Sequence, residues 1–464
     1  MKHKVAITAV VVVVILLSAL MYVRAENGRL HSGSEDDDVG LLVGNEVGED
    51  EFPSPSSRLW VYGNANEDDV IDESDVEYLK GVIDGDYEAT TLCDANLDGT
   101  VDWDDIEYVE RIIASDEMDV FYIDNYYLNA KVSWPVNTIA IGYCSGAYAI
   151  DLVGVADKVV LVDETISNYW YVMNSHFASS ESYGTTESPN YEKMIAAGID
   201  VYVIGYFDKT ADEQSRSTLN PAGIDVMFLS TADNSGVDQP DENIDRTLVM
   251  LGFLLQGDMD KTYEYLDWHD SVLSALEEVT SQLEDDEKSA FIMARTSPYY
   301  STSGISITGL NNTNNIHAEW VGVYAVGQHN ETLSKNYQTI TAETLLTIIE
   351  AEAEARDGKL YYMDNAHDGI RGQYSLKDCV AADIEMLDSS SVDIVYMAMA
   401  REAGNSPLYV VELAFYVCAI YPDLAEEAGI DYEELFEYYF DNFATEDYSE
   451  YVSDITKFFY LYKG

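Results

Sequence analysis

The sequence of 464 residues has few cysteines and few basic side chains. Its four cysteines, Cys93, Cys144, Cys379 and Cys418, are widely spaced and form no CxxC pair. This spacing argues against a zinc ribbon, a CxxC redox centre and a disulfide-dense scaffold. Lys and Arg number 24 against 86 Asp and Glu, so the formal net charge is −62. Such a chain repels nucleic acid and anionic lipid, and neither is expected as a partner.

The familiar catalytic motifs are also missing. The sequence has no GxSxG, no HExxH, no Walker loop and no Rossmann fingerprint. It therefore predicts no enzyme. Hydrophobic residues make up 47% of the chain, which argues against global disorder despite the charge. The length allows about three domains and a large core.

The N-terminus has the pattern of an export segment. Residues 1–4 are basic and residues 5–23 are almost entirely apolar, a length at the boundary between a signal peptide and a membrane anchor. We expect residues 1–25 to serve as one of these, with the rest of the chain secreted or anchored at the extracellular face. A buried core helix is the alternative. Residues 26–58 are acidic and rich in Gly, Ser and Pro, which predicts a flexible linker.

Two twelve-residue segments carry oxygen-bearing side chains at alternating positions. In residues 94–105 these occupy loop positions 1, 3, 5, 9 and 12, and Gly99 stands at position 6, where an EF-hand-type loop turns sharply. An earlier copy, residues 64–75, departs from this pattern with Asn at position 1 and Asp69 at position 6. The expected calcium ligands are Asp94, Asn96, Asp98, Thr100, Asp102 and Asp105 in the second loop, and Asn64, Asn66, Asp68, Val70, Asp72 and Asp75 in the first. Acidic turns that match by chance are the alternative.

Each loop is followed by a helical stretch, residues 76–80 and 106–113. A loop plus helix with Asp at position 12 and an apolar residue four positions later, Leu79 or Val109, resembles the type I dockerin pair. The resemblance implies a small all-α EF-hand-like domain over residues 59–118, with calcium as its structural cofactor. It also implies possible docking onto a cohesin-type protein.

From about Asp119 onward, short apolar strands alternate with helical segments, which predicts parallel sheets covered by helices. The expected strands are residues 138–143, 158–162, 201–206, 226–229, 290–294, 359–363 and 392–397, and the expected helices are residues 148–153, 191–197, 241–255 and 341–355. Between them, residues 258–283 lack Gly and Pro and repeat apolar residues at steps of three and four. This spacing predicts one long amphipathic helix.

Segments in this region resemble the class III periplasmic solute-binding proteins of ABC importers. The resemblance is carried by VNTIAIGY at 136–143, AIDLVGVADKVVLV at 149–162, SPNYEKMIAAGIDVYVI at 188–204, ITAETLL at 340–346 and the helix 409–424. It implies an α/β fold with two lobes, residues 119–257 and 285–464, joined by a helix at 258–284. It further implies an extracytoplasmic protein that delivers an iron-siderophore, or a related chelate such as haem or a corrinoid, to an ABC permease.

A ligand is expected where the carboxyl ends of the strands face a cleft between the lobes. Arginines there can hold carboxylates or the anionic oxygens of a metal chelate, and aromatic rings can line a pocket for a large planar ligand. The candidates are Arg295, Arg371, Arg401, Tyr169, Trp170, Tyr171, Tyr206 and Tyr299. Each arginine alone could instead form an ion pair, and each aromatic side chain could simply pack.

Three further readings remain open. Glu192 matches the first-lobe carboxylate that, in the resembled family, meets the permease. The histidines His176, His317, His329 and His367 could bind a bare metal ion, although they lack HxxxH spacing. Alternatively, the chain is a cell-surface interaction protein, with the dockerin-like pair as its working part and the α/β region recognising a glycan or another protein.

Overall fold

The computed structural model describes residues 43–48, 52–166, 175–204, 209–229, 242–295, 304–356, 359–366, 375–388, 390–404, 406–444 and 454–463. Among these residues, no helix combines the length and the apolar composition needed to cross a membrane. The expected export segment lies outside the described residues.

The first lobe is built on a parallel five-stranded sheet of order β5-β4-β3-β8-β9. Its strands are β3 (Ile139–Ile141), β4 (Val159–Val162), β5 (Glu181–Ser182), β8 (Val201–Val203) and β9 (Asp225–Met227). The helices of this lobe are α4 (Cys144–Leu152), α5 (Ser175–Ser179), α6 (Tyr191–Ala197) and α7 (Lys209–Leu219), and β6 (Gly184–Thr185) pairs with β7 (Ser188–Pro189). Its central strands, such as the fully buried β8, are continuous apolar runs because both faces of the sheet are covered.

The second lobe has a mixed sheet of order β13-β11-β10-β14-β15-β16, with β12 also paired to β10. Its strands are β10 (Ala290–Arg295), β11 (Ile305–Thr308), β12 (Tyr324–Ala325), β13 (Tyr337–Ile340), β14 (Lys359–Ala366), β15 (Asp393–Ala400) and β16 (Phe459–Leu461). The predicted parallel pairing is found for β10, β14 and β15, whereas β11, β13 and β16 add antiparallel edges. The helices of this lobe are α10 (Thr313–Trp320), α11 (Val326–His329), α12 (Ala342–Ala355), α13 (Leu376–Leu387), α14 (Arg401–Gly404), α15 (Tyr409–Ile420), α16 (Pro422–Ala428) and α17 (Tyr432–Asn442).

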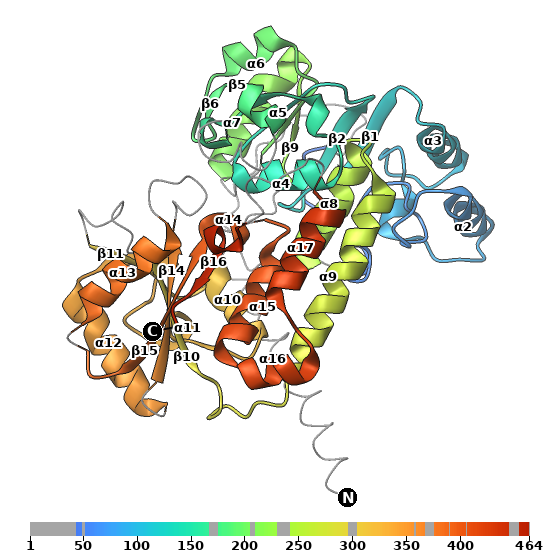
Figure 1. Cartoon of the computed structure of the whole chain (residues 1–464). Helices are drawn as coiled ribbons and strands as arrows, with labels where there is room; N and C mark the ends of the chain where they lie inside the picture. The colour runs from blue at the N-terminus through green and yellow to red at the C-terminus, as the bar shows by residue number, and fades with distance from the viewer. Residues whose placement is uncertain are drawn as a thin grey trace, which may run out of the picture. The chain divides into compact units, whose positions relative to one another are not determined.

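The long helix expected at residues 258–283 is confirmed as α9 (Met259–Thr280). Asp258 caps its N-terminus by accepting a hydrogen bond from the backbone N–H of Lys261 at 3.0 Å. One face of the helix is buried and includes Tyr265, His269 and Val272. This face packs against α8 (Glu242–Leu254) and against α15 and α16 of the second lobe (Figure 1).

The two calcium-type loops are followed by α2 (Glu73–Asp84) and α3 (Trp103–Ile113), which pack against each other. Next comes the hairpin of β1 (Met118–Ile123) and β2 (Asn129–Trp134). Backbone hydrogen bonds join Trp60 and Tyr62 to β1. The buried side chains of Leu79 and Val109 belong to the same hydrophobic cluster as Val272 of α9. The loop pair therefore shares its core with the α/β region.

Part of the segment expected to be a linker also packs on this hairpin. The backbone N–H groups of Gly44 and Val47 donate to the carbonyls of Asn129 and Tyr127, at 2.7 and 2.8 Å. Val47 is buried, and the ring of Phe52 stacks on that of Tyr127 at a centroid distance of 4.6 Å. Residues 43–48 and 52–58 are thus joined to the body by main-chain and side-chain contacts.

Candidate functional site

A buried polar cluster lies at the carboxyl ends of the first-lobe strands. Asp163 directly follows β4, and its carboxylate accepts hydrogen bonds from the backbone N–H of Thr165 at 2.7 Å and that of Thr186 at 2.6 Å. Gly142 follows β3, and a Cβ at this position would lie 3.1 Å from the hydroxyl of Tyr183 and 3.2 Å from that of Tyr202. The glycine therefore leaves room for the two phenols, which hydrogen-bond each other at 3.1 Å.

The corresponding region of the second lobe contains a buried carboxyl group. Glu412 of α15 is fully buried and accepts a hydrogen bond from the hydroxyl of Tyr416. Burial raises the pKa of Glu412 to about 7, although this hydrogen bond opposes the rise. Asn314 of α10 lies beside the carboxylate and favours its charged form. A Cβ on Gly404 would lie within 2.8 Å of both groups, so a larger residue at this position would have to displace these side chains.

Arg295 is the sequence-predicted ligand residue whose side chain the structure describes. It ends β10, its Nη2 donates to the hydroxyl of Tyr337 at 2.6 Å, and its guanidinium lies 4.2 Å from the centre of the same ring. Tyr337 begins β13, so the contact depends on the antiparallel edge of the sheet. Of the other candidates, Tyr169, Trp170, Tyr171, Tyr206, Tyr299 and Arg371 lie outside the described residues, as does the side chain of Arg401. Their role in ligand binding stays a prediction.

Glu192 lies on the surface of the first lobe. It occupies the first turn of α6, which begins after Asn190, and its side chain is exposed. The helix start borders a shallow cavity of about 670 Å³ whose lining includes Glu192 and Lys193. The carboxylate is thus accessible to a partner, and permease contact stays a prediction.

The described histidines named from the sequence do not form a metal-binding cluster with one another. Nε2 of His176 lies 2.7 Å from the carbonyl of Val159, and His329 pairs with Glu319. Burial lowers the pKa of His317 to about 3, so it is neutral. Among the described residues, the one group of three metal-type side chains contains none of these histidines. His367 lies outside the described residues.

The second calcium-type loop is closed by its last carboxylate. Asp105 is buried and accepts hydrogen bonds from the backbone N–H of Asn96 at 3.2 Å and that of Asp102 at 2.7 Å. Asp94 accepts from the backbone of Asp98 and Gly99 at 3.0 and 2.8 Å. Burial raises the pKa of Asp105 to about 6, and the nearby charge of Asp94 adds to the rise. A divalent cation bound in the loop would compensate both carboxylates, so the arrangement fits calcium.

The first loop is closed in the same way by its last carboxylate, Asp75, but it has Asp69 in place of glycine at the turn. Asp75 is buried and accepts from the backbone of Asn66 and Asp72 at 3.1 and 2.9 Å, and burial raises its pKa to about 6. Asn64 is buried too, and its Oδ1 has no hydrogen-bond partner. Asp69, at position 6, adopts φ +70°. A non-glycine residue in this left-handed region needs compensating contacts.

Asp69 has these contacts outside the loop. Its carboxylate accepts hydrogen bonds from the backbone N–H groups of Arg58 and Leu59, at 2.5 and 2.9 Å, and from the hydroxyl of Ser57 at 3.2 Å. It also pairs with Nε of Arg58 at 3.2 Å. The residue that breaks the sequence pattern at position 6 therefore anchors residues 57–59 to the first loop.

No family model matches the chain, and no curated protein is similar to it in sequence. Solved structures with a similar fold include the TroA-like periplasmic binding protein FepB of Veillonella parvula, at 12% identity and a TM-score of 0.53, covering 70% of this chain and 96% of that one. The molybdate periplasmic binding protein MolA of Haemophilus influenzae matches at 13% identity and a TM-score of 0.54. This match covers 70% of this chain and 97% of that one. The structure of Helicobacter pylori CeuE with Ni(II) bound matches at 12% identity and a TM-score of 0.53. This match covers 74% of this chain and 98% of that one.

These likenesses, at low identity, show the fold. The chain has the α/β architecture of TroA-like periplasmic binding proteins, which confirms the predicted two-lobe region. The small dockerin domain stays a prediction, as do its calcium ions.

Proposed function

We propose that the chain is an extracytoplasmic solute-binding protein that delivers a metal chelate to an ABC importer. The observation that carries this proposal is the fold, in which two α/β lobes are joined by the single long helix α9. Proteins with this fold include a periplasmic binding protein for molybdate and a protein solved with Ni(II). The basic and apolar start of the sequence supports export, to a secreted or membrane-anchored state.

The proposed cargo is an iron-siderophore, haem or a corrinoid. Arg295, Arg371 and Arg401 would hold the anionic oxygens of the chelate, and the aromatic candidates would line the pocket. The cation–π contact with Tyr337 fixes the guanidinium of Arg295 at the end of β10, which supports a preorganised anion contact. Glu192 is proposed to contact the permease.

The test is a binding titration of the purified chain with ferric siderophores, haem, cobalamins, molybdate and Ni²⁺. We expect saturable binding of one class at micromolar or lower concentration, measured by calorimetry because coloured ligands quench fluorescence. Arg295→Gln should weaken binding of an anionic chelate about tenfold, whereas Arg111→Gln on α3 should not change it. A folded protein that binds nothing in this panel would contradict the proposal.

We infer that calcium occupies both twelve-residue loops and that the pair is dockerin-like. A second candidate function, docking onto a cohesin-type protein, is favoured by Trp103 at the start of α3, because this large side chain is 61% exposed. Trp103→Ala should then abolish calcium-dependent binding to a cohesin domain while leaving ligand binding unchanged. Equal cohesin binding with and without calcium would argue against docking through the loops.

A further inference from the structure

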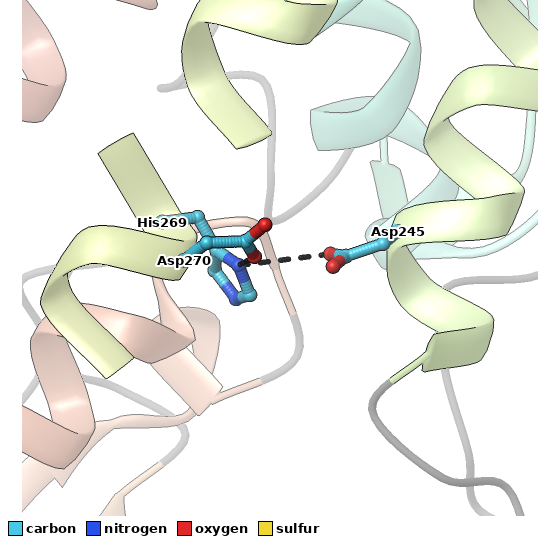
Figure 2. A group of neighbouring side chains, drawn as sticks. All are labelled: Asp245, His269 and Asp270. Carbon is cyan, nitrogen blue, oxygen red and sulfur yellow. Dashed lines mark hydrogen bonds and ion pairs between the residues drawn. The ribbon is translucent and has the colours of Figure 1, made fainter. Parts of the chain in front are cut away.

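Three metal-type side chains converge where α8 packs against α9. Figure 2 shows Asp245 approaching from α8, and His269 and Asp270 approaching from α9. Nδ1 of His269 lies 3.1 Å from Oδ1 of Asp270 and 3.7 Å from Oδ1 of Asp245. The donor atoms of all three residues lie within 4.8 Å of one another, so one ion can contact all of them after small side-chain shifts.

The imidazole of His269 is held from its other side. It is 1% exposed, and its Nε2 hydrogen-bonds the hydroxyl of Tyr409 at the start of α15. This contact fixes the ring so that Nδ1 points towards the two carboxylates. Metal-binding histidines are commonly fixed in this way through their outer nitrogen.

The cluster borders a cavity of about 490 Å³, which gives an ion and its water ligands a route from solvent. The cavity lining includes Arg58, Trp60, Tyr127, Asp245, Arg246 and Asp270. Its two arginines have partners outside the cluster, and Arg58 also forms an ion pair with Asp270. The guanidinium of Arg246 lies 3.9 Å from the centre of the Trp60 ring. Arg58 pairs more closely with Asp69, at 3.2 Å, than with Asp270, at 3.9 Å.

We propose that Asp245, His269 and Asp270 bind one divalent transition-metal ion of the Zn²⁺ class. One imidazole nitrogen and two carboxylate oxygens form a mixed N/O donor set that suits zinc better than calcium, and water from the cavity completes the coordination. The ion joins α8 to the middle of α9. The site is separate from the strand ends proposed for the cargo and from the calcium loops. The alternative is a protonated His269 between the two carboxylates, with no metal.

The test is a Zn²⁺ titration of the full chain by calorimetry in excess Ca²⁺, which keeps the twelve-residue loops filled. We expect one saturable zinc site. Asp270→Asn should weaken it at least tenfold, because the variant removes one anionic ligand. The matched control is Asp267→Asn, an exposed carboxylate on the same helix, which should leave the zinc affinity within about twofold of the original.

The visible absorption of bound Co²⁺ provides a second readout that does not depend on heats of binding. The Co²⁺ bands should be lost in Asp270→Asn and Asp245→Asn and kept in Asp267→Asn. Because the side chain of Asp270 is 54% exposed, Asp270→Asn should retain the fold, which circular dichroism checks. If Asp270→Asn and Asp267→Asn bind zinc equally well, or if no saturable site exists in excess Ca²⁺, the proposal is wrong and the three residues are an ion-paired cluster.

Discussion

Glu412 shows at the level of one residue how burial makes stability depend on pH. Its pKa is about 7 in the folded chain against 4.5 for the free side chain, so the folded state binds the proton more tightly. The stabilising contribution is complete below pH 4.5 and is lost as the pH rises through 7. This difference corresponds to about 3 kcal/mol of unfolding free energy.

We therefore expect Glu412→Gln to remove this pH dependence. The amide oxygen of Gln can still accept the hydrogen bond from Tyr416, but the side chain no longer ionises. Relative to the unchanged protein, the variant should gain about 2–3 kcal/mol of stability between pH 5 and pH 8, measured by urea unfolding. The control is Glu437→Gln on α17, an exposed position, which should show no such gain. If the free energy of unfolding changes with pH in the same way in Glu412→Gln and in the unchanged protein, the shifted pKa of Glu412 is wrong.

Asp69 is a second residue whose role is clear from its contacts. Because its carboxylate anchors the backbone of Arg58 and Leu59, Asp69→Ala should lower the free energy of unfolding by about 2–3 kcal/mol. The loss should be equal with and without calcium, since the carboxylate lies outside the ligand set. Thermal unfolding in Ca²⁺ and in EGTA measures both values. A loss seen only in Ca²⁺ would place Asp69 among the ligands instead.

At the level of elements, the sequence predicts the helices and strands whose signal lies within their own residues. The expected bounds of α6 agree with the structure residue for residue, and those of α9 within a few residues, where apolar periodicity marks the helix. The buried parallel strands were also predicted. The hairpin of β1 and β2 and the edge strands β11, β13 and β16 were missed, because their pairing depends on partners far along the chain.

The same distinction applies to the sites. The ligand pattern of residues 94–105 is local and could be recognised from spacing alone. The contact between Arg295 and Tyr337 joins residues 42 positions apart through β13, and no periodicity signals it. Asp245 and His269 meet only because α8 packs against α9. His269, on the buried face of α9, had no sequence signal beyond an apolar helical face.

The last carboxylate of each loop provides a variant that tests each of the two proposed calcium sites separately. Asp105→Asn keeps one of the two backbone hydrogen bonds that close the second loop and removes one anionic ligand, so calcium affinity there should fall at least about tenfold. Asp75→Asn should do the same in the first loop. Calorimetry should then show one tight site in each variant and two in the unchanged chain. Two tight sites in Asp105→Asn would rule out this residue as a ligand.

At the level of the whole molecule, calcium should stabilise the α/β region as well as the loops. Leu79, Val109 and Val272 belong to one hydrophobic cluster. In addition, the hydroxyl of Tyr263 on α9 donates a hydrogen bond to the carbonyl of Asp69 at 2.6 Å. A loop filled at 100 times its Kd contributes about 2.7 kcal/mol. For a cooperative unit of this size, that raises Tm by about 3 °C.

We therefore expect calorimetry to show one thermal transition that moves down as a whole when EGTA removes calcium. Asp105→Asn should reduce the movement by at least about a quarter, because a loop that binds calcium tenfold more weakly contributes about 1.4 kcal/mol in place of about 2.7 kcal/mol. A separate low-temperature transition that alone responds to calcium would instead show that residues 59–118 unfold independently, as an autonomous docking domain would. The shared core favours the single transition, because separating the loop pair from α9 would divide one hydrophobic cluster and break the hydrogen bond from Tyr263 to Asp69.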